Sequence, residues 1–393
     1  MKYWIFMSLI ATLGLLPDGL RAQGGDDAWL KKAQLGAHAP KTQDWEAIRA
    51  AAKAEGKVVI YSVSSRIFRL QKEFKQKFGV DIEGHDIGSD TQLEKFRREH
   101  QAGVYNVDVL FNNEGPSLLN EFLPKKLVWN FVPDSVIPFL DKDEMAPFLV
   151  QRWSSRIIMY NGARHQKSPV NNLWDLTRKE WKGKVLVPGM DSAIMANSFQ
   201  TILRYPDALA EAHKQAFGKP VTYSDKLTRL VKANPALGPA DAAKEWLYRL
   251  MQNSVFLDST DNVYNSIAGV KQENPPIGIT TFSKLRDNKA GVYDAQPAYD
   301  IKPAFGVSYP TLLVIADRAP NPNAAKLLIR YMMEDGYAPW DMPGDYAARS
   351  DFVKNQVAKF KIPPFDDLKM WKVDPKHVYD TRFTFVELMQ GLR

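Results

Sequence analysis

The stretch GKVVIYSVSSRIFRLQKEFKQKFG, residues 56–79, decides the fold class, because it places a strand, a serine-rich turn and an amphipathic helix in succession. Residues 58–61 (VVIY) are an unbroken apolar run, which is typical of a parallel strand covered on both faces. Apolar residues then recur at helical spacing as far as Gly79, which is suited to ending a helix in the left-handed conformation. Ser64 or Ser65 is the expected N-cap of that helix.

The same alternation continues on both sides of this stretch. Residues 44–56 predict a preceding helix that ends at a glycine, and residues 80–87 predict a second strand. Residues 89–92 (SDTQ) fit a capping box that opens the next helix, and residues 106–112 (NVDVLFN) predict a third strand. This β-α-β-α-β order predicts an α/β fold with a doubly wound parallel sheet.

The second half of the chain restarts the pattern of strand, polar turn and helix. Helices are expected over most of residues 205–253, and the tail from Pro343 is expected to be irregular, with a helix near residues 380–390. The expected strands are residues 156–161, 184–188, 276–281, 292–297 and 305–316.

Polar residues follow several of these strands at the point where each strand ends. In an open α/β sheet, ligands bind at the carboxyl ends of the strands, and the first N–H groups of the following helix attract anions. The serine-rich corner at residues 62–66 therefore suits an anion or a polar group. Serines are also common helix caps without any ligand, and this single corner does not separate the two interpretations.

The composition favours a globular protein without nucleic-acid binding. The 393 residues are enough for two domains, with 45% hydrophobic and 25% charged residues. The net charge is +7, but the lysines and arginines are interspersed with acidic residues rather than gathered into a basic stripe. The chain has no cysteine, which excludes disulfides, thiolate chemistry and lipid attachment through cysteine.

The N-terminus predicts export. Residues 1–22 combine Lys2, an apolar run from Tyr3 to Leu16 and a small-residue site at Ala22, as in a cleaved signal peptide. A membrane anchor is the alternative, but the run is shorter than about 20 residues and is followed by Pro17 and Asp18. We therefore expect a soluble, exported protein without a direct membrane anchor, in which residues 23–43 form a leader of the mature chain.

No catalytic or metal-binding motif is present in the sequence. The six histidines are scattered, and there is no H-E-x-x-H, G-x-S-x-G or Walker A spacing. Glu83, His85 and Asp86 resemble a hard-metal cluster, but in a strand Asp86 points away from the other two, which favours a solvated strand end. We therefore expect no enzyme activity, no catalytic residue, no cofactor and no metal site.

From about Ala51 to the C-terminus, the chain resembles the extracellular solute-binding proteins of ABC-type importers, in the group that includes periplasmic ferric-iron-binding proteins. The residues that carry the resemblance are EGKVVIYS (55–62), SDTQLEKFRREHQAG with DVL (89–103 and 108–110), IIMYN (157–161), LWDLTRKEWKGKVLVPGMDSA (173–193) and APNPNAAKLLIRYMM (319–333).

The resemblance implies a two-lobed type II periplasmic-binding-protein fold, with two mainly parallel α/β lobes joined by crossover strands. Lobe one would contain residues 44–150 plus 298–345, and lobe two residues 151–297. Residues 346–393 would pack on the lobes. The solute would be clamped between the lobes by hinge closure, and the protein, a periplasmic monomer, would deliver it to a membrane permease.

The resemblance also implies five ligand loops, and the strand ends identified from the residue pattern fall in the same loops. Their residues are Ser62, Ser64, Ser65, Arg66, Asn112, Asn113, Glu114, Asp191, Ser192, Ala193, Ser259, Thr260, Asp261, Asn262, Thr280, Thr281 and Phe282. Arg66 is either a counter-charge for an anionic solute or a solvated helix residue.

One departure from the iron-binding members bears on the solute. Those members carry two adjacent tyrosines as iron ligands after the strand that corresponds to residues 276–281, whereas this chain has Thr280, Thr281 and Phe282 there and no Tyr-Tyr pair anywhere. We therefore expect a small polar or anionic solute that bears phosphate, phosphonate or carboxylate. A ferric-iron receptor and an exported enzyme on the same scaffold are the alternatives.

Overall fold

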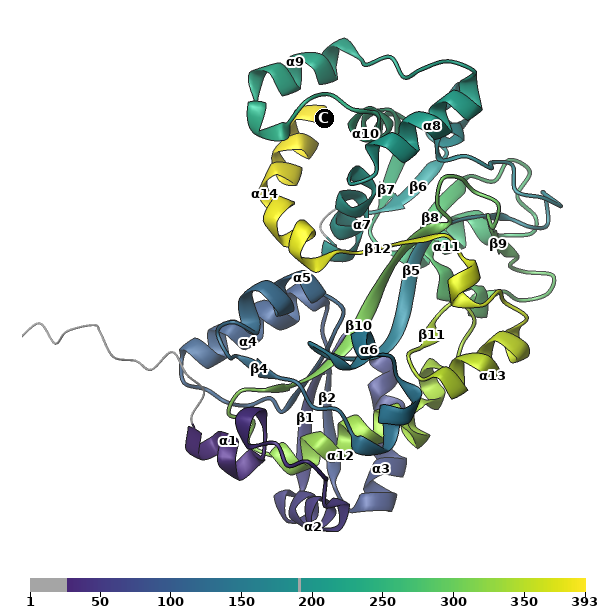
Figure 1. Cartoon of the computed structure of the whole chain (residues 1–393). Helices are drawn as coiled ribbons and strands as arrows, with labels where there is room; N and C mark the ends of the chain where they lie inside the picture. Colours follow the sequence, from purple (N-terminus) through teal and green to yellow (C-terminus); the bar gives the residue numbers. More distant parts are fainter. Residues whose placement is uncertain (1–26, 190–191) are drawn as a thin grey trace, which may run out of the picture.

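The computed structural model describes residues 27–189 and 192–393, so the predicted signal peptide lies outside the described residues. Within these ranges the chain forms two α/β lobes (Figure 1) that share one twelve-stranded sheet. Its main strands follow the order β2-β1-β3-β10-β5-β8-β6-β7. The type II periplasmic-binding-protein fold expected from the sequence is therefore confirmed.

Lobe one contains residues 56–79, which form β1, the turn after it and α3. Strand β1 pairs in parallel with both β2 and β3, as the β-α-β-α-β order predicts. The strands of this part are β1 (Lys57–Ser62), β2 (Asp81–Asp86), β3 (Val109–Asn112) and β4 (Val128–Trp129). Its main helices are α2 (Trp45–Glu55), α3 (Gln71–Phe78), α4 (Ser89–Gln101), α5 (Gly115–Ser117), α6 (Lys142–Met145) and α12 (Pro322–Met333).

Two long antiparallel strands join the lobes. These crossover strands are β5 (Leu149–Asn161) and β10 (Gly306–Ala316), and each belongs to the sheet of both lobes. Strand β10 pairs with β3 in lobe one, whereas β5 pairs with β8 in lobe two. Strand β5 begins seven residues before the predicted segment 156–161, because its first half contains polar residues that interrupt the apolar pattern.

Lobe two repeats the parallel arrangement, with β6 paired to both β7 and β8. Its strands are β6 (Val185–Pro188), β7 (Ser254–Leu257), β8 (Ile277–Thr281) and β9 (Ala295–Pro297). Its helices are α7 (Ala193–Leu203), α8 (Pro206–Phe217), α9 (Asp225–Ala233), α10 (Ala242–Asn253) and α11 (Thr260–Ala268). The helices expected over residues 205–253 are therefore present.

Each lobe has its own apolar core. Strand β10 contributes Leu313 and Val314 to the core of lobe one, and Val307 to the core of lobe two. Burial of large apolar side chains on both sides stabilises each lobe by about 25 cal/mol per Å² of apolar surface removed from water. A single strand therefore ties two separate cores together.

The leader expected over residues 23–43 is partly helical in the structure. Helix α1 (Asp27–Ala33) and a short turn at Gly36–His38 pack on lobe one, where Leu30 and Leu35 are buried in its core. Two buried leucines in a polar stretch were too few to reveal a helical period in the sequence.

The tail from Pro343 is also more regular than expected. It contains β11 (Tyr346–Ala347), α13 (Ser350–Phe360), β12 (Met370–Lys372) and α14 (Pro375–Leu392). Helix α14 runs along lobe two in Figure 1, with its first turn next to α5 of lobe one. Pro375 O accepts a hydrogen bond from Asn120 in lobe one, and Thr381 bonds to Gln200 in lobe two.

Two predicted helix starts need correction. The chain leaves β1 through a 3-10 turn, η2 (Ser65–Arg69), and only then enters α3, and the Ser64 side chain makes no capping hydrogen bond. The capping box predicted at residues 89–92 is absent, because α4 begins at Ser89 itself and its N-cap is Gly88. Both serines instead bond to residues of neighbouring loops.

Short 3-10 and π turns complete the chain. Two of them, η8 (Phe282–Asp287) and η9 (Asp335–Trp340), follow β8 and α12. The others are η3 (Leu118–Phe122), η4 (Asp134–Phe139), η5 (Leu173–Thr177), η6 (Lys179–Trp181), η7 (Pro235–Leu237) and η10 (Phe365–Asp367).

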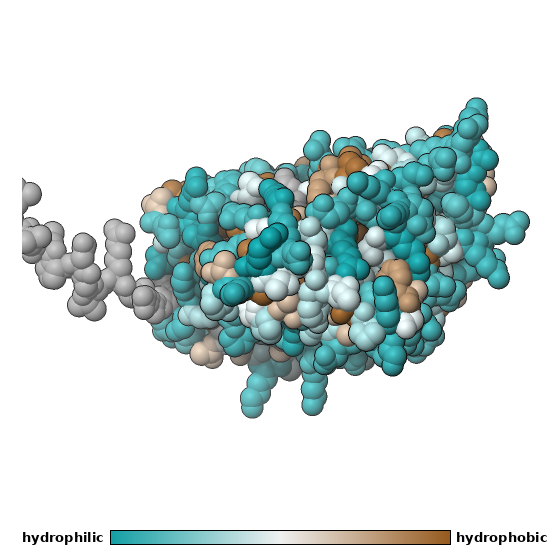
Figure 2. Space-filling view, turned by 90° about the horizontal axis from the view of Figure 1, so that it is seen from above, coloured by the Kyte–Doolittle hydropathy of each residue, from teal (hydrophilic) through white to brown (hydrophobic). Residues whose placement is uncertain are grey.

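The surface seen from the lobe-two end is mainly hydrophilic, and its apolar side chains form small separate patches (Figure 2). No helix in the two described ranges is both long enough and apolar enough to cross a bilayer.

Candidate functional site

The ends of the parallel strands bring the predicted ligand loops together within each lobe. Ser62 at the end of β1 lies between Asp86 of β2 and Phe111 of β3. In lobe two, Pro188 of β6 lies beside Leu257 of β7, and β6 also pairs with β8. Because neighbouring strands are about 4.8 Å apart, the loops that leave them are neighbours too.

The serines of the first loop make internal hydrogen bonds rather than lining open space. The Ser62 hydroxyl is fully buried, donates to the Ser64 carbonyl at 2.9 Å and accepts from the Ser64 N–H at 3.1 Å. The Ser64 hydroxyl is buried and accepts from the Trp340 indole at 3.2 Å. Ser65 is exposed, so it is the one serine of this loop with a hydroxyl open to solvent.

Arg66, the second residue of η2, is a half-buried cation, and its guanidinium makes no hydrogen bond within the described ranges. Burial, and after it the charge of Arg286 in lobe two, lower the pKa of Arg66 from its usual range to about 10. Even so, Arg66 stays protonated near neutral pH. A cation held in this state favours an anionic partner.

The segment Trp340–Asp345 joins the Ser64 loop to lobe two. Trp340 bonds to Ser64, as described above, and the sulfur of Met342 lies 3.7 Å from Arg286 Nη1. Gly344 has a φ of +81° and lies so close to Phe282 that a Cβ atom would come within 2.6 Å of the Phe282 carbonyl carbon. Residues of both lobes therefore meet at this segment.

Asp345, at the end of this segment, is buried against crossover strand β5. Its carboxylate accepts a hydrogen bond from the Ser154 hydroxyl at 2.7 Å and lies 3.5 Å from Arg152 Nε. The Arg152 guanidinium also lies over the ring of Phe111, with 5.1 Å to the centroid. Arg152 is therefore a paired, buried cation, although its Nε donor makes no hydrogen bond.

Arg156, further along β5, has only neutral partners. Its Nη1 donates to the Thr281 hydroxyl and to the Tyr309 hydroxyl, the latter at 3.0 Å. No carboxylate of the described residues forms an ion pair with it, and its buried Nε has no hydrogen-bond acceptor. Alternation along the strand places Arg152, Ser154 and Arg156 on the same face of β5.

These groups form a basic cluster at the junction of the lobes, which we define as Arg66, Arg152, Arg156 and Arg286. Arg152 pairs with Asp345, and Arg286 lies 3.4 Å from Asp287. Arg66 and Arg156 form no ion pair within the described residues. The cluster therefore carries two guanidinium charges that no described carboxylate pairs with.

The loop after β3 is a closed hydrogen-bond network in lobe one. Asn112 Nδ2 donates to the Ser89 carbonyl and to Gln92, and Asn112 Oδ1 accepts from the Glu114 N–H at 2.6 Å. The Ser89 hydroxyl bonds to Asn113 Oδ1. Asn112 and Glu114 are buried, so they hold the loop in shape.

The same loop contacts lobe two at α7. Glu114 accepts a hydrogen bond from Asn197 at 3.3 Å, and Asp90 accepts one from the Ala193 N–H at 3.2 Å, so that a carboxylate of lobe one lies at the N-terminus of α7. Burial is the main cause that raises the pKa of Asp90 and Glu114 above the usual range. Ser192 is the N-cap of α7 without a side-chain bond, and Asp191 lies outside the described residues.

The predicted loop at residues 259–262 and Thr280 serve structural roles in lobe two. The Ser259 hydroxyl caps α11 by accepting from the Asn262 N–H at 3.1 Å, and the Thr280 hydroxyl donates to the Thr260 carbonyl. Asp261 forms an ion pair with the buried Lys284. These bonds hold the loop against η8.

Phe282, the last predicted site residue, is fully buried in an aromatic group. Its ring packs at 5.4 Å from Phe305 and at 6.1 Å from Tyr299. A residue that the sequence places beside a ligand is here part of the lobe-two core, and Thr281 is the residue of this strand end that bonds to the basic cluster.

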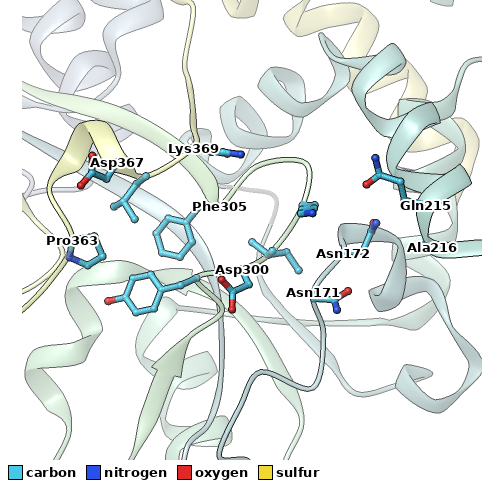
Figure 3. Close-up of a pocket in the computed structure, with 13 residues that line it drawn as sticks. Asn171, Asn172, Gln215, Ala216, Asp300, Phe305, Pro363, Asp367 and Lys369 are labelled. Atoms are coloured by element: carbon cyan, nitrogen blue, oxygen red, sulfur yellow. The ribbon is translucent and has the colours of Figure 1, made fainter.

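A separate cavity of about 670 Å³ opens between lobe two and the segment before β12. Figure 3 shows Asp300, Lys369, Asp367 and Gln215 around it, with the Phe305 ring on its wall. None of the residues predicted from the sequence as ligand contacts lines this cavity. Its two acidic and two basic side chains, Asp300, Asp367, Lys302 and Lys369, balance in charge.

No group of three or more His, Cys, Asp or Glu side chains placed to hold a metal ion occurs in the described part of the chain. His85 and Glu83 are 3.3 Å apart, and Asp86 does not join them.

Sequence reasoning missed Arg152, Arg156, Arg286 and Asp90. The first two had a signal: they stand in the segment VQRWSSRIIMYN (150–161), where charged residues interrupt a strand that becomes strongly apolar. Arg286 and Asp90 had none, because surface helices and turns commonly carry isolated charges.

The chain was compared with protein-family models, curated proteins and solved structures. No protein-family model matches the chain, and no curated protein is significantly similar to it in sequence. Solved structures with the same fold include iron-bound HitA from Pseudomonas aeruginosa, at 14% identity and a TM-score of 0.61 over 85% of this chain and 99% of that one.

Two further structures show the range of the likeness. Apo ferric ion-binding protein A from Pasteurella haemolytica has 17% identity and a TM-score of 0.56, over 86% of this chain and 98% of that one. The spermidine/putrescine substrate-binding protein PotD from Streptococcus pneumoniae has 17% identity and a TM-score of 0.51, over 86% of this chain and 99% of that one. At these identities the likeness establishes the fold alone: the chain has the two-lobed fold of these binding proteins.

Proposed function

We propose that this protein is the substrate-binding component of an ABC-type importer, and that it binds a small anionic solute between its lobes. The observation that carries the proposal is Arg66: a half-buried guanidinium in the turn after β1, without a hydrogen-bond or carboxylate partner in the described chain, that is subject to the positive charges of Arg286 and Arg152.

The neighbours in structure space support a binding protein but not one solute. HitA is iron-bound, ferric ion-binding protein A is named for ferric iron and PotD is named for spermidine and putrescine, so the fold alone does not select the ligand. The chemistry of this chain's own site must do so, and a cluster of guanidinium groups favours phosphate, phosphonate or carboxylate.

A ferric-iron receptor is the less favoured reading. The described residues hold no group of three or more His, Cys, Asp or Glu placed for a metal ion, and the strand end at residues 280–282 has two threonines and a core phenylalanine instead of paired phenolates. The division into lobes proposed from the sequence is kept, except that Ala298, Ile301 and Phe305 pack in the lobe-two core. Hinge closure, a permease partner, a monomeric state and a periplasmic location are parts of the same proposal.

A thermal-shift screen tests the proposal. The intact protein is mixed with phosphate esters, phosphonates, carboxylates, polyamines and ferric citrate. A solute at 100 times its dissociation constant adds about 2.7 kcal/mol to the free energy of unfolding, which raises Tm by several degrees. We expect anionic solutes to raise it, and each active solute to be recovered unchanged, as from a receptor and not an enzyme.

A matched pair of variants locates the site. Arg66→Gln removes the proposed counter-charge, and Arg69→Gln removes the same charge from the exposed end of the same turn. We expect the Tm shift caused by an anion to fall strongly in Arg66→Gln and to persist in Arg69→Gln. Stabilisation by polyamines or iron alone, or equal loss in both variants, would refute the proposal.

A further inference from the structure

The number of unpaired arginines in the basic cluster indicates how many negative charges the solute has. Of the four arginines in the cluster, Arg152 and Arg286 have carboxylates close by, at 3.5 Å and 3.4 Å. Lys284, near Arg286 in the sequence, is paired with Asp261 and Asp287. Within the basic cluster, the two charges without a carboxylate partner among the described residues are thus those of Arg66 and Arg156.

The charges of Asp345 and Arg152 act near both unpaired arginines, Arg66 and Arg156. Arg66 is affected by the charges of Asp345 and Arg152, and the same two groups act on Tyr309, whose hydroxyl accepts from Arg156. Arg152 and Arg156 are four residues apart on one face of β5, about 13 Å between Cα atoms. Ser154 lies between them on that face and bonds to Asp345, the carboxylate whose charge acts on Arg66, so the charge of Arg66 is felt at the same face of β5.

Buried polar atoms without partners lie on this same face. The Nε atoms of Arg152 and Arg156 and the hydroxyl of Thr311 make no hydrogen bond, and Thr311 lies directly opposite Arg152 in the β5–β10 register. Arg152 and Thr311 are 5% and 0% exposed, respectively. Unsatisfied buried donors are costly, and an acceptor-rich ligand would satisfy them.

Resting on the proposed function, we infer that the anionic group of the solute is a dianion of the phosphate-monoester or phosphonate type, held through the charges of Arg66 from lobe one and Arg156 from the crossover strand. Two uncompensated guanidinium charges match two negative charges. A carboxylate or a sulfate monoester supplies only one, and leaves one half-buried cation unpaired.

The inference also gives a reason for closure to depend on the solute. Arg66 belongs to lobe one and Arg286 to lobe two, and their like charges repel across the junction. A dianion between the lobes converts this repulsion into attraction on both sides. An uncharged solute or one with a single charge removes less of it.

Ethyl phosphate and ethyl sulfate are the probes that test this inference. They share one alkyl group and a tetrahedral head, but ethyl sulfate is singly charged throughout, whereas a phosphate monoester gains its second charge above a pKa of about 6. Calorimetric or NMR titration of the full mature chain at pH 7.5 should give at least about a tenfold tighter dissociation constant for ethyl phosphate, a difference of about 1.4 kcal/mol.

The pH dependence separates charge from shape. Between pH 5 and pH 7.5 the affinity for ethyl phosphate should rise about tenfold or more, while the affinity for ethyl sulfate stays level, because the arginines remain charged throughout. Equal affinities at pH 7.5, or parallel pH profiles, overturn the inference and leave an anion receptor standing. Failure of both probes together with every other anion overturns the proposed function itself.

Variants assign the two charges. Arg66→Gln and Arg156→Gln should each reduce the preference for phosphate over sulfate to less than about threefold, whereas Arg69→Gln keeps it. Since Arg156 bonds to Thr281 and Tyr309 and its loss also disturbs the fold, Arg156→Lys serves as the second variant: it retains the charge and should retain most of the preference. Full preference in Arg156→Gln overturns the assignment of Arg156.

Discussion

Single residues at the end of β1 have roles that their position in the sequence conceals. Ser62 and Ser64 look like ligand contacts, yet their hydroxyls are buried and bonded within the protein. Ser65 is exposed beside them. The three serines therefore differ in how much the protein depends on each hydroxyl.

Replacement of Ser64 by alanine should destabilise the protein measurably. The Trp340 indole N–H, which donates to Ser64 Oγ at 3.2 Å in a buried environment, would lose its acceptor. An unsatisfied buried donor costs about 1–3 kcal/mol, whereas a change at an exposed position usually stays within about 0.5 kcal/mol. Urea unfolding of Ser64→Ala and Ser65→Ala tests this, and equal stabilities would show that the indole bond contributes nothing.

Asp108 is a second residue with a measurable signature. It is fully buried between β1 and the start of α12, where it accepts from the backbone N–H groups of Val59 and Asn321. Burial nevertheless dominates and raises the pKa of Asp108 from 3.8 to about 6. The folded state therefore favours the protonated carboxyl.

The raised pKa of Asp108 determines how the free energy of unfolding changes with pH. The contribution of Asp108 to the free energy of unfolding is fully present below pH 3.8 and is lost as the pH rises through about 6. The loss amounts to at most about 3 kcal/mol. Carbon-13 NMR of the aspartate carboxyls should show one titration with a midpoint near pH 6 that disappears in Asp108→Asn; a midpoint near pH 4 for that resonance would contradict the prediction.

At the residue scale the sequence predicted the site only in part. Arg66 and Thr281 could be placed at strand ends from local pattern, because the end of an apolar run is visible in the sequence. The bonding of each side chain could not, since Ser64 meets Trp340 276 residues away. Contacts of that span depend on how the lobes pack, which no local pattern encodes.

Elements were more predictable than side chains. The helix before β1, the parallel pairs in both lobes and helix α12 follow from apolar periodicity and terminal glycines. Helices α1 and α13 were missed, because their apolar residues are few and each packs only one narrow face. Tertiary contacts, rather than strong local patterns, stabilise such helices.

The segment Trp340–Asp345 gives a test at this scale. In Gly344→Ala the new methyl group would meet the backbone of Phe282 at 2.6 Å, and the residue would keep a φ of +81° that side chains disfavour. Gly103→Ala is the matched control, since its φ is +74° but no atom lies within 4 Å of the added carbon.

Both alanine variants should lose about 1 kcal/mol from the left-handed conformation, and Gly344→Ala should lose about 1–3 kcal/mol more from the steric contact. Thermal unfolding followed by circular dichroism measures the difference. Equal Tm values for the two variants would mean that the segment moves aside without cost, so that it does not fix the two lobes relative to each other.

At the scale of the whole molecule, Asp90 of lobe one contacts α7 of lobe two. The Asp90 carboxylate accepts from the N–H of Ala193, and a hydrogen bond to a charged group contributes about 1.5–3 kcal/mol. The carboxylate also occupies a helix N-terminus that is suited to an external anion. It therefore stabilises the arrangement of the two lobes seen in the structure.

Loss of this carboxylate should open the lobes. Small-angle X-ray scattering of Asp90→Ala without solute should give a larger radius of gyration than the unmodified protein. Asp207→Ala, which removes an exposed acidic residue from the first turn of α8, serves as the control and should not change it. A radius that stays the same in Asp90→Ala would show that other contacts, such as those of α14, determine closure.

The shared strand β10 also determines when each half of the chain can finish folding. Asn112 of β3 pairs with Leu312, so the sheet of lobe one closes a loop of about 200 residues. Such long closures slow folding, because chain entropy is lost before the contacts form. During synthesis, lobe one stays incomplete until the whole of lobe two and β10 have been made. The nascent chain therefore stays partly unfolded for longer than a chain of two independent domains.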